Sequence, residues 1–508
     1  MVIKMVEKFD AIVIGSGTGG AGCAAILASA GLKTILLEKN PILGGRCTSY
    51  VKEFKGEKWI IDKYVHYFCR CEKGPFGQIL KKAGEPNAIK WFHPTFENPP
   101  LGYLDDKPVG APLPPFLKPS NMQDIQKATG ASDEDMSGLL KVFDIIFSIT
   151  KRKSKQLDDI TFDDWVRSIL KNEKLIMILH TLCVMMNVQL PFDIEYKGKK
   201  YPGASAGDSI RNLAKWFKAG NTGYPIGGSI AISDGFASVV EKYGGIVRKN
   251  AKVININVDE FEKVVELEDG SQYAAPIVVS NVGIKETVLK LVGEEKFPKD
   301  YVKRVKELIY SEGSRDYGVV SLKIAVDKKL IKSPVILAIP QTLSFKEILE
   351  FKAKDIVPDR PGLFYITIPS NMDPSLAPNG KQLINAIGPC AINSKHLDDW
   401  VEYNLSAVEK YIPNLRDHIL FMDITVGDNI CEWTGRFESD MVGIAQSVGQ
   451  VGDKRPKPET PIEGLYIACA DTGAIGIGTE LSAQAGLDTA GLILEYIKSY
   501  PEKIKLSK

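Results

Sequence analysis

The clearest hydrophobic pattern in the chain is a short apolar run near its start, at residues 9–14. A run of this length without polar alternation is typical of a strand that is buried on both faces. A glycine-rich turn follows, then small residues over 21–30, and then a second apolar run at 34–37. This order predicts a strand, a helix that ends at Gly31 and a second strand.

Helical periodicity dominates the region from 137 to 192. Apolar side chains follow Thr161 at helical spacing, and a threonine followed by acidic residues is typical of a helix start. The apolar segment 175–186 is shorter than the ~20 residues that span a bilayer, and polar residues interrupt it at 180 and 181. We predict a buried helix there, with a half-submerged or substrate-facing helix as the alternative.

The other patterns alternate between strands and helices. Asp269-Gly270 between two apolar runs predicts a hairpin turn, and the prolines over 94–119 predict an irregular connection. Predicted strands occupy 253–258, 264–267, 318–326, 363–368, 383–387 and 464–468, and predicted helices occupy 232–243, 399–412 and 479–494.

Length and charge narrow the class of protein. At about 150 residues per domain, a chain of 508 residues predicts two to four domains. The 64 basic and 63 acidic residues leave a net charge of +1, which disfavours nucleic acid as a partner. The basic cluster 151–155 is predicted to be solvated, with peripheral membrane contact as the alternative.

Cysteine usage indicates neither a zinc ribbon nor a disulfide framework, because the eight cysteines include no Cys-x-x-Cys pair. Cys69 and Cys71 lie beside His66, but no second pair supplies the remaining ligands, and we predict no metal site. The first residues lack a signal-peptide pattern. The expected location is the cytoplasm, with association at a membrane as the alternative.

The glycine-rich turn carries the most specific chemistry. Gly15 permits a tight turn, Gly17 permits the backbone to approach a pyrophosphate, and Gly20 permits close packing of the helix on the sheet. The helix N-terminus offers N–H groups and a positive dipole end to phosphates. Glu38 lies 18 residues after the last glycine, where a carboxylate accepts hydrogen bonds from ribose hydroxyls. The pattern predicts a dinucleotide site, and the carboxylate disfavours NADP.

A second glycine pair, Gly44-Gly45, precedes Arg46. This segment resembles the second signature of the phytoene desaturases and flavin amine oxidases. The resemblance implies FAD as the cofactor, with Gly45 and Arg46 at the pyrophosphate and the flavin, and with Lys39 in the same site. The alternative for Arg46 is a loop position at the surface.

Three later segments, 224–258, 276–283 and 435–494, resemble the same phytoene desaturase-like family. The resemblance implies that Val253 contacts the adenine and that Asp471 holds the ribityl chain. It also implies that the helix starting at Gly478 and Thr479 points at the pyrimidine edge of the flavin. The family commonly has glycine before the acid, where this chain has Ala470.

The resemblance implies an α/β fold with a Rossmann-type FAD-binding domain built from discontinuous segments, a mixed-sheet substrate domain and a helical cap. We expect the FAD-binding domain over 1–95, 200–285 and 431–508, the cap over 96–199, and the substrate domain over 286–430.

The implied activity is desaturation or saturation of carbon–carbon bonds in a long apolar isoprenoid or polyene, with hydride transfer at flavin N5. The electron acceptor is left open. His66 and Tyr67 are candidate catalytic residues, with a structural role as the alternative for His66. Three other functions also stay open: a redox-neutral polyene isomerase, a flavin amine oxidase and a non-enzymatic prenyl-lipid carrier. Amine oxidases carry a tyrosine where this chain has Gly478.

Overall fold

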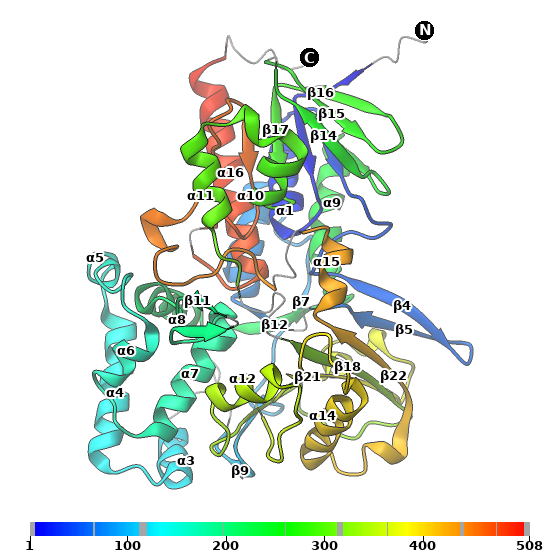
Figure 1. The fold of residues 1–508 in the computed structure, drawn as a ribbon. Coiled ribbons are helices and arrows are strands. Elements are labelled where there is room, and N and C mark those ends of the chain that lie inside the picture. The colour runs from blue at the N-terminus through cyan, green and yellow to red at the C-terminus, as the bar shows by residue number, and fades with distance from the viewer. Residues whose placement is uncertain are drawn as a thin grey trace.

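The structure is a computed structural model, and it shows both described ends of the chain in the same upper part of the molecule (Figure 1). A group of helices and a large sheet form the lower part. The described residues are 6–64, 67–110, 119–196, 198–259, 261–311, 318–362, 364–436, 441–473 and 475–501.

A parallel five-stranded sheet lies at the centre of the upper part, in the order β13-β3-β2-β17-β23. Val13 pairs with Leu36 on one side and with Val279 on the other, and all three are fully buried. The strands come from distant parts of the chain: β2 (Ala11–Ile14), β3 (Thr34–Leu37), β13 (Ile246–Arg248), β17 (Ile277–Ser280) and β23 (Leu465–Ile467).

Four of the described helices cover one face of this sheet, and the first of them consists largely of small residues. A Cβ added at Gly486 would lie 2.2 Å from the carbonyl oxygen of Gly19, so the first and last long helices touch backbone to backbone. Glycine at both positions permits this approach. The helices packed together here are α1 (Thr18–Ser29), α2 (Pro75–Lys82), α9 (Ala231–Lys242) and α16 (Thr479–Ser499).

A four-stranded sheet and two helices pack on the opposite face. The predicted hairpin turn at Asp269-Gly270 is confirmed, since it joins two antiparallel strands and the Gly270 N–H donates to the Leu267 carbonyl. The elements on this face are β1 (Glu7–Lys8), β14 (Val253–Asn257), β15 (Lys263–Leu267), β16 (Gln272–Ala275), α10 (Ile284–Glu286) and α11 (Lys299–Glu307).

A seven-stranded sheet of order β22-β18-β21-β20-β19-β8-β9 forms the lower right of Figure 1. Helix α14 packs on one face of it through Trp400 and Val408. Its strands are β8 (Leu101–Leu104), β9 (Lys107–Pro108), β18 (Val319–Val326), β19 (Val335–Ile339), β20 (Phe364–Thr367), β21 (Gln382–Pro389) and β22 (Ile419–Val426). Nearby helices are α12 (Phe345–Ala353), α13 (Pro369–Met372), α14 (Leu397–Tyr411) and α15 (Asp428–Thr434).

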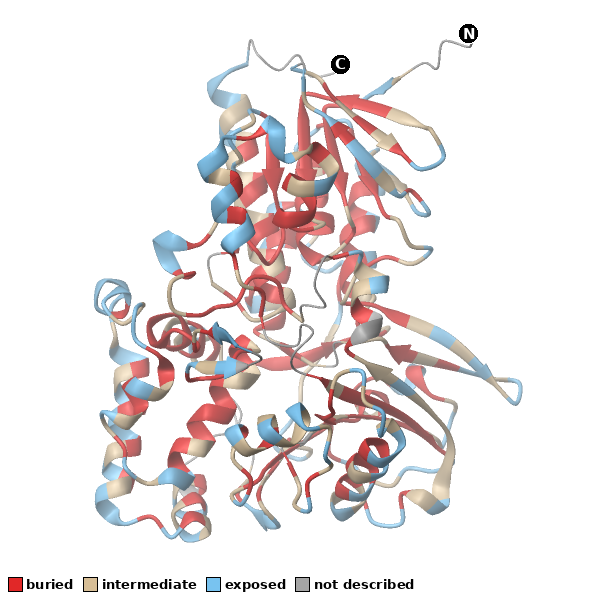
Figure 2. Cartoon of the chain, in the orientation of Figure 1, coloured by how far each residue is buried: buried red, intermediate tan, exposed pale blue. Residues whose placement is uncertain are grey.

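A separate helical group forms the lower left of the same view, with its buried residues facing inward (Figure 2). The predicted helix start at Thr161 is confirmed, because its side chain accepts the Asp164 N–H. The predicted buried helix over 175–186 is also confirmed, as α7. The group contains α3 (Pro119–Thr129), α4 (Asp133–Ser148), α5 (Lys151–Lys155), α6 (Phe162–Arg167), α7 (Glu173–Asn187) and α8 (Ala206–Ala219).

Three small sheets lie between the upper and lower parts, at the middle height of Figure 1. The carboxylate of Asp62 accepts hydrogen bonds from the Ser49 and Tyr224 hydroxyls and from the Ser229 N–H, which ties the hairpin β4-β5 to β12. The strands are β4 (Ser49–Phe54), β5 (Glu57–Asp62), β6 (Phe68–Cys69), β7 (Trp91–Phe92), β12 (Thr222–Pro225), β10 (Ile194–Tyr196) and β11 (Lys199–Tyr201).

None of the helices in the described part of the chain is long and apolar enough to cross a lipid bilayer.

Candidate functional site

One cavity of about 610 Å³ runs between the parallel sheet and the seven-stranded sheet. Its volume lies within the ~300–1,000 Å³ that is usual for sites of small molecules and cofactors. At one end it is lined by the glycine turn after β2, and at the other by Tyr67, Tyr365 and Ile387. The cavity therefore joins a polar end and a largely apolar end without a break.

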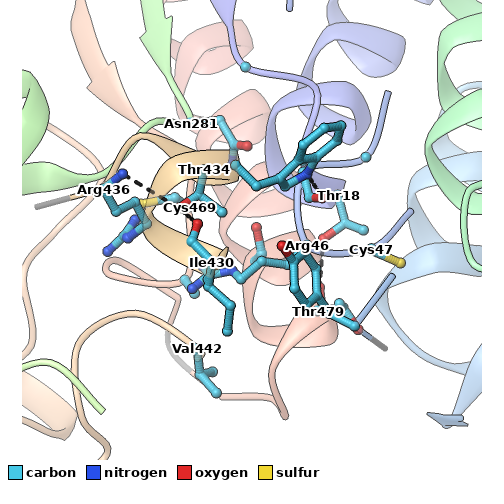
Figure 3. A pocket seen from close by; sticks show the side chains of 18 of the residues that line it. Thr18, Arg46, Cys47, Asn281, Ile430, Thr434, Arg436, Val442, Cys469 and Thr479 are labelled. Carbon is cyan, nitrogen blue, oxygen red and sulfur yellow. Dashed lines mark hydrogen bonds between the residues drawn. The ribbon is translucent and has the colours of Figure 1, made fainter. Parts of the chain in front are cut away.

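Two helix N-termini meet at the polar end. Helix α1 begins after Gly17 and α16 begins after Gly478, and both starts line the cavity. The Thr18 hydroxyl donates to the Thr479 carbonyl at 2.8 Å, which holds the two starts together (Figure 3). Within the described residues, neither start has a hydrogen bond from a capping side chain. Backbone N–H groups and two positive dipole ends therefore face one cavity, as anion binding requires.

The glycines of the first turn are required by close packing. A Cβ at Gly17 would lie 2.4 Å from Asn281 Oδ1, and a Cβ at Gly20 would lie 2.1 Å from the Gly15 carbonyl oxygen. Gly15 has φ +94°, a backbone conformation that favours glycine. The turn, the strand before it and the helix after it thus have the geometry that the sequence predicted.

Glu38 is buried at the end of β3 and is 4% exposed. Its Oε2 accepts from the Ser16 N–H at 2.9 Å and from the Ser16 hydroxyl at 2.5 Å. Its Oε1 accepts from the Asn40 N–H at 2.9 Å. A carboxylate oxygen has two acceptor sites, so Oε1 keeps one site for a further donor. Glu38 lines the cavity and at the same time ties β3 to the glycine turn.

The second glycine turn lies against the first. A Cβ at Gly45 would lie 3.7 Å from the Gly17 Cα, and both residues line the cavity with Arg46. Helix α15 closes over this turn, because the Trp433 indole N–H donates to the Gly45 carbonyl at 2.8 Å. Lys39 Nζ donates to the carbonyl of Glu432 in the same helix. Burial lowers the pKa of Lys39, although the neighbouring Glu38 acts in the opposite direction.

Asp471 is fully buried beside the cavity rather than in its lining. It accepts from Arg436 Nη2 at 2.9 and 3.1 Å, from the Ile284 N–H at 2.9 Å and from the Ile444 N–H at 3.0 Å. Burial alone would raise its pKa, but Arg436 and the two N–H donors outweigh it and the pKa of Asp471 is lowered. These bonds use the acceptor sites of both oxygens. The ribityl contact stays a prediction.

Glu480, in the first turn of α16, forms a second buried ion pair in the site. Arg70 Nη2 lies 2.9 Å from Glu480 Oε2, and the Arg70 side chain is 9% exposed. Glu480 Oε1 has no hydrogen-bond partner among the described residues. Burial raises the pKa of Glu480 to about 7, against the lowering effect of Arg70.

The apolar end of the cavity includes the predicted Tyr67. Its hydroxyl lies 2.7 Å from the Thr222 hydroxyl, and burial raises its pKa well above the ordinary value. Tyr365 and Val188 line the same end. His66, the other candidate catalytic residue, lies outside the described residues. The predicted Val253 lines the cavity at the polar end, next to Ala251 and Lys252.

One cluster of metal-type ligands occurs in the described part of the chain, at Cys71, Glu72 and His93. The ligand atoms lie within 4.8 Å of one another, and His93 Nε2 is 3.1 Å from Glu72 Oε2. The sequence reasoning considered Cys71 with His66 and missed His93, because 22 residues separate His93 from Cys71 and no spacing motif joins them. Because the His93 ring and the Glu72 carboxylate contact each other directly, their short distance is not by itself evidence of a metal ion.

The sequence reasoning also missed residues that the fold brings into the site from elsewhere. No role was predicted for any of them, although three lie in the segments 276–283 and 435–494 that resemble the family, and the packing of distant strands and helices places them. They are Arg70, Asn281, Ser321, Tyr365, Thr425, Trp433, Arg436 and Glu480.

The parallel sheet, the two glycine turns and the buried acid after β3 define a Rossmann-like domain. A family model described as an NAD(P)-binding Rossmann-like domain matches residues 13–83.

Curated relatives support the resemblance predicted from the sequence. Phytoene desaturase of Fusarium fujikuroi is 26% identical over 415 residues, covering 75% of this chain and 66% of the relative. Carotenoid 3,4-desaturase of Haloarcula japonica is 24% identical over 523 residues, and the match covers 96% of this chain and 98% of the relative. Human all-trans-retinol 13,14-reductase is 25% identical over 303 residues, and the match covers 55% of this chain and 48% of the relative. The chain thus has phytoene desaturase, carotenoid desaturase and retinol reductase homologues, which confirms the resemblance.

The extent of these matches varies. The chain spans about half the length of several curated relatives that it matches, with 52% and 48% of two of them covered.

Solved structures show the same fold over nearly the whole chain. An oxidoreductase from Methanosarcina mazei is 20% identical, with a TM-score of 0.67, and the match covers 96% of this chain and 100% of the other. Putrescine oxidase is 13% identical, with a TM-score of 0.64, and the match covers 97% and 100%. The predicted α/β fold is confirmed.

Proposed function

We propose that this chain is an FAD-dependent oxidoreductase that desaturates or saturates carbon–carbon bonds of a long apolar isoprenoid or polyene. The observation that carries the proposal is the single cavity that joins the glycine turns and Glu38 to the apolar wall at Tyr67, Tyr365 and Ile387. The phytoene desaturase, carotenoid desaturase and retinol reductase homologues support this class of substrate.

The residues at the polar end fit a flavin dinucleotide. The first glycine turn and the start of α1 offer backbone N–H groups for the phosphates. Glu38 keeps an acceptor site for a ribose hydroxyl. Val253 lines the same cavity, and the proposal assigns it the contact with the adenine ring. Arg46 and Lys39 supply positive charge, and Gly478 leaves space at the start of α16, since a Cβ there would meet no atom within 4 Å.

FAD, when bound, supplies hydride chemistry, and the chain supplies binding, orientation and exclusion of water. The start of α16 directs N–H groups into the cavity, where they would stabilise negative charge. Tyr67 keeps its proton at neutral pH because burial raises its pKa. Together with Tyr365 and Ile387 it presents an apolar surface to a chain of carbon atoms.

An anaerobic reaction tests the proposal. The bound flavin is reduced without excess reductant, a polyene such as all-trans-retinol or a carotenoid is added, and the flavin absorbance is followed. Reoxidation by a polyene supports saturation. Bleaching of the oxidised protein by a saturated isoprenoid supports desaturation.

Two results of the same experiment contradict the proposal. Bleaching by amines alone, such as putrescine, would assign the chain to the amine oxidases. Isomerisation of a polyene by the reduced protein without reoxidation would assign a redox-neutral isomerase.

A further inference from the structure

Two hydroxyl side chains lie side by side on the cavity face of the seven-stranded sheet. Ser321 in β18 is paired directly with Thr425 in β22, and both line the cavity. On the other side of Ser321 the same row continues through Ile387 and Tyr365. Because opposite residues in neighbouring strands point to the same face, the two hydroxyls form a polar end to an otherwise apolar wall.

Ser321 is buried without a hydrogen-bond partner. The residue is 8% exposed, and its Oγ has no partner among the residues that the structure describes. A buried hydroxyl without a partner costs free energy that a hydrogen bond would recover. Since Ser321 lines the cavity, a polar atom of a bound molecule is the partner that the geometry provides for.

Thr425 is oriented by a buried lysine. Lys323, two residues along β18 from Ser321, is fully buried, and its Nζ donates to Thr425 Oγ1 at 2.5 Å. Burial lowers the pKa of Lys323 to about 8, although Asp423 acts to raise it. Because the Thr425 oxygen accepts from the lysine, its own hydrogen is available for another acceptor.

We propose that Ser321 and Thr425, with Lys323 behind Thr425, bind an oxygen atom of the substrate. Both hydroxyls act as donors, so the atom is an acceptor: the oxygen of an alcohol, a carbonyl or a carboxylate. The substrate is then an oxygenated isoprenoid, whose carbon chain lies along Ile387 and Tyr365. This inference rests on the proposed function, and it adds a requirement that the proposed function does not contain.

Selectivity follows from the cost of the unpaired donors. A hydrocarbon of the same shape fills the apolar wall but leaves both hydroxyls without an acceptor. A site built to hydrogen-bond a polar group discriminates strongly against the analogue that lacks it. Ser321 and Thr425 therefore act as specificity-determining residues.

Binding of matched ligand pairs to the FAD-loaded protein tests the inference. The pairs are all-trans-retinol with its deoxy analogue, and zeaxanthin with β-carotene, followed by quenching of protein fluorescence. In at least one pair, we expect the affinity for the oxygenated member to be at least about 10-fold higher than the affinity for the hydrocarbon. Ser321→Ala and Thr425→Val each reduce that preference about 5-fold or more and leave the affinity of the hydrocarbon unchanged.

A matched control is Ser406→Ala, an exposed serine on α14 at the opposite face of the sheet. It leaves the preference at its wild-type value. Circular dichroism and flavin content check that each variant is folded and loaded.

Three results would overturn the inference: equal affinity within both pairs, no binding by any of the four compounds, or a preference that both substitutions leave intact. The inference would also be overturned if Ser321→Ala and Thr425→Val reduced the affinity for flavin and left the ligand preference unchanged, since the hydroxyls would then face the cofactor. Failure of the proposed function is a different result, namely a protein without flavin, or a flavin that no polyene reoxidises and that no saturated isoprenoid bleaches.

Discussion

At the residue scale, two buried ion pairs set the chemistry around the cavity. Arg436 and Asp471 are 3% and 0% exposed in their side chains, and the carboxylate is further bonded by two backbone N–H groups. Arg70 and Glu480 lie at the start of α16 with only one carboxylate oxygen paired. The first pair is complete in its hydrogen bonds and the second is not, so we expect different responses to mutation and to pH.

Removing one member of the complete pair is expected to destabilise the protein strongly. Arg436→Gln or Asp471→Asn leaves a buried charge without its partner, at a cost of about 3–5 kcal/mol in the free energy of unfolding. The double variant loses less than the sum of the two single losses. Urea unfolding of the four proteins measures this, and additive losses or single losses below about 1 kcal/mol would refute it.

The incomplete pair is expected to make stability depend on pH. The pKa of Glu480 is raised to about 7 in the folded protein, above the ~4.3 of an unfolded glutamate. Between these values the folded state binds the proton more tightly, so stability falls as pH rises from about 4.3 to 7 and is level above that window. The difference in unfolding midpoint between wild type and Glu480→Gln should change across this window. A constant difference from pH 5 to 8 would contradict the assignment.

At the element scale, the contact between α1 and α16 holds the two ends of the chain together. Gly486 lies against the backbone of Gly19, and the Gly19 N–H donates to the Ser482 hydroxyl. This contact keeps both helix starts at the cavity. Any side chain at Gly486 would separate them.

Gly486→Ala is therefore expected to destabilise the fold by about 1–3 kcal/mol through overpacking, and to weaken flavin binding. Gly491→Ala is the matched control in the same helix, because a Cβ there would meet only Lys82 Nζ at 3.5 Å. That change should be neutral or stabilise by up to about 1 kcal/mol. Thermal unfolding of both variants distinguishes them, and equal midpoints would contradict the packing argument.

The elements could be predicted well where a pattern is local. The strand 34–37 was predicted to the residue, because a threonine and three apolar residues are followed by the charged Glu38. Helix α1 begins at Thr18, three residues before the predicted start, because the second half of the glycine turn already belongs to the helix. The hydrogen bond from the Trp433 indole to the Gly45 carbonyl could not be predicted. The two residues are 388 positions apart, and no local sequence pattern relates them.

At the scale of the whole molecule, distant segments build one site. The glycine turn, Glu38 and the start of α16 were predicted as parts of a dinucleotide site, and the structure brings them to one cavity. Ser321, Tyr365 and Thr425 were not predicted, because cross-strand pairing alone places them together. The division into FAD-binding, cap and substrate domains stays a prediction, and so do the individual roles of the site residues.

The central claim is that both ends of the chain bind one flavin dinucleotide, and a titration tests it most directly. The purified protein is titrated with FAD while the flavin fluorescence and the bound flavin spectrum are recorded. We expect one FAD per chain, no comparable binding of NADP, and an affinity about 10-fold or more lower in Glu38→Gln. Glu53→Gln, at an exposed glutamate of β4, should bind as the wild type does. A folded protein that takes up no FAD from excess cofactor would contradict the account.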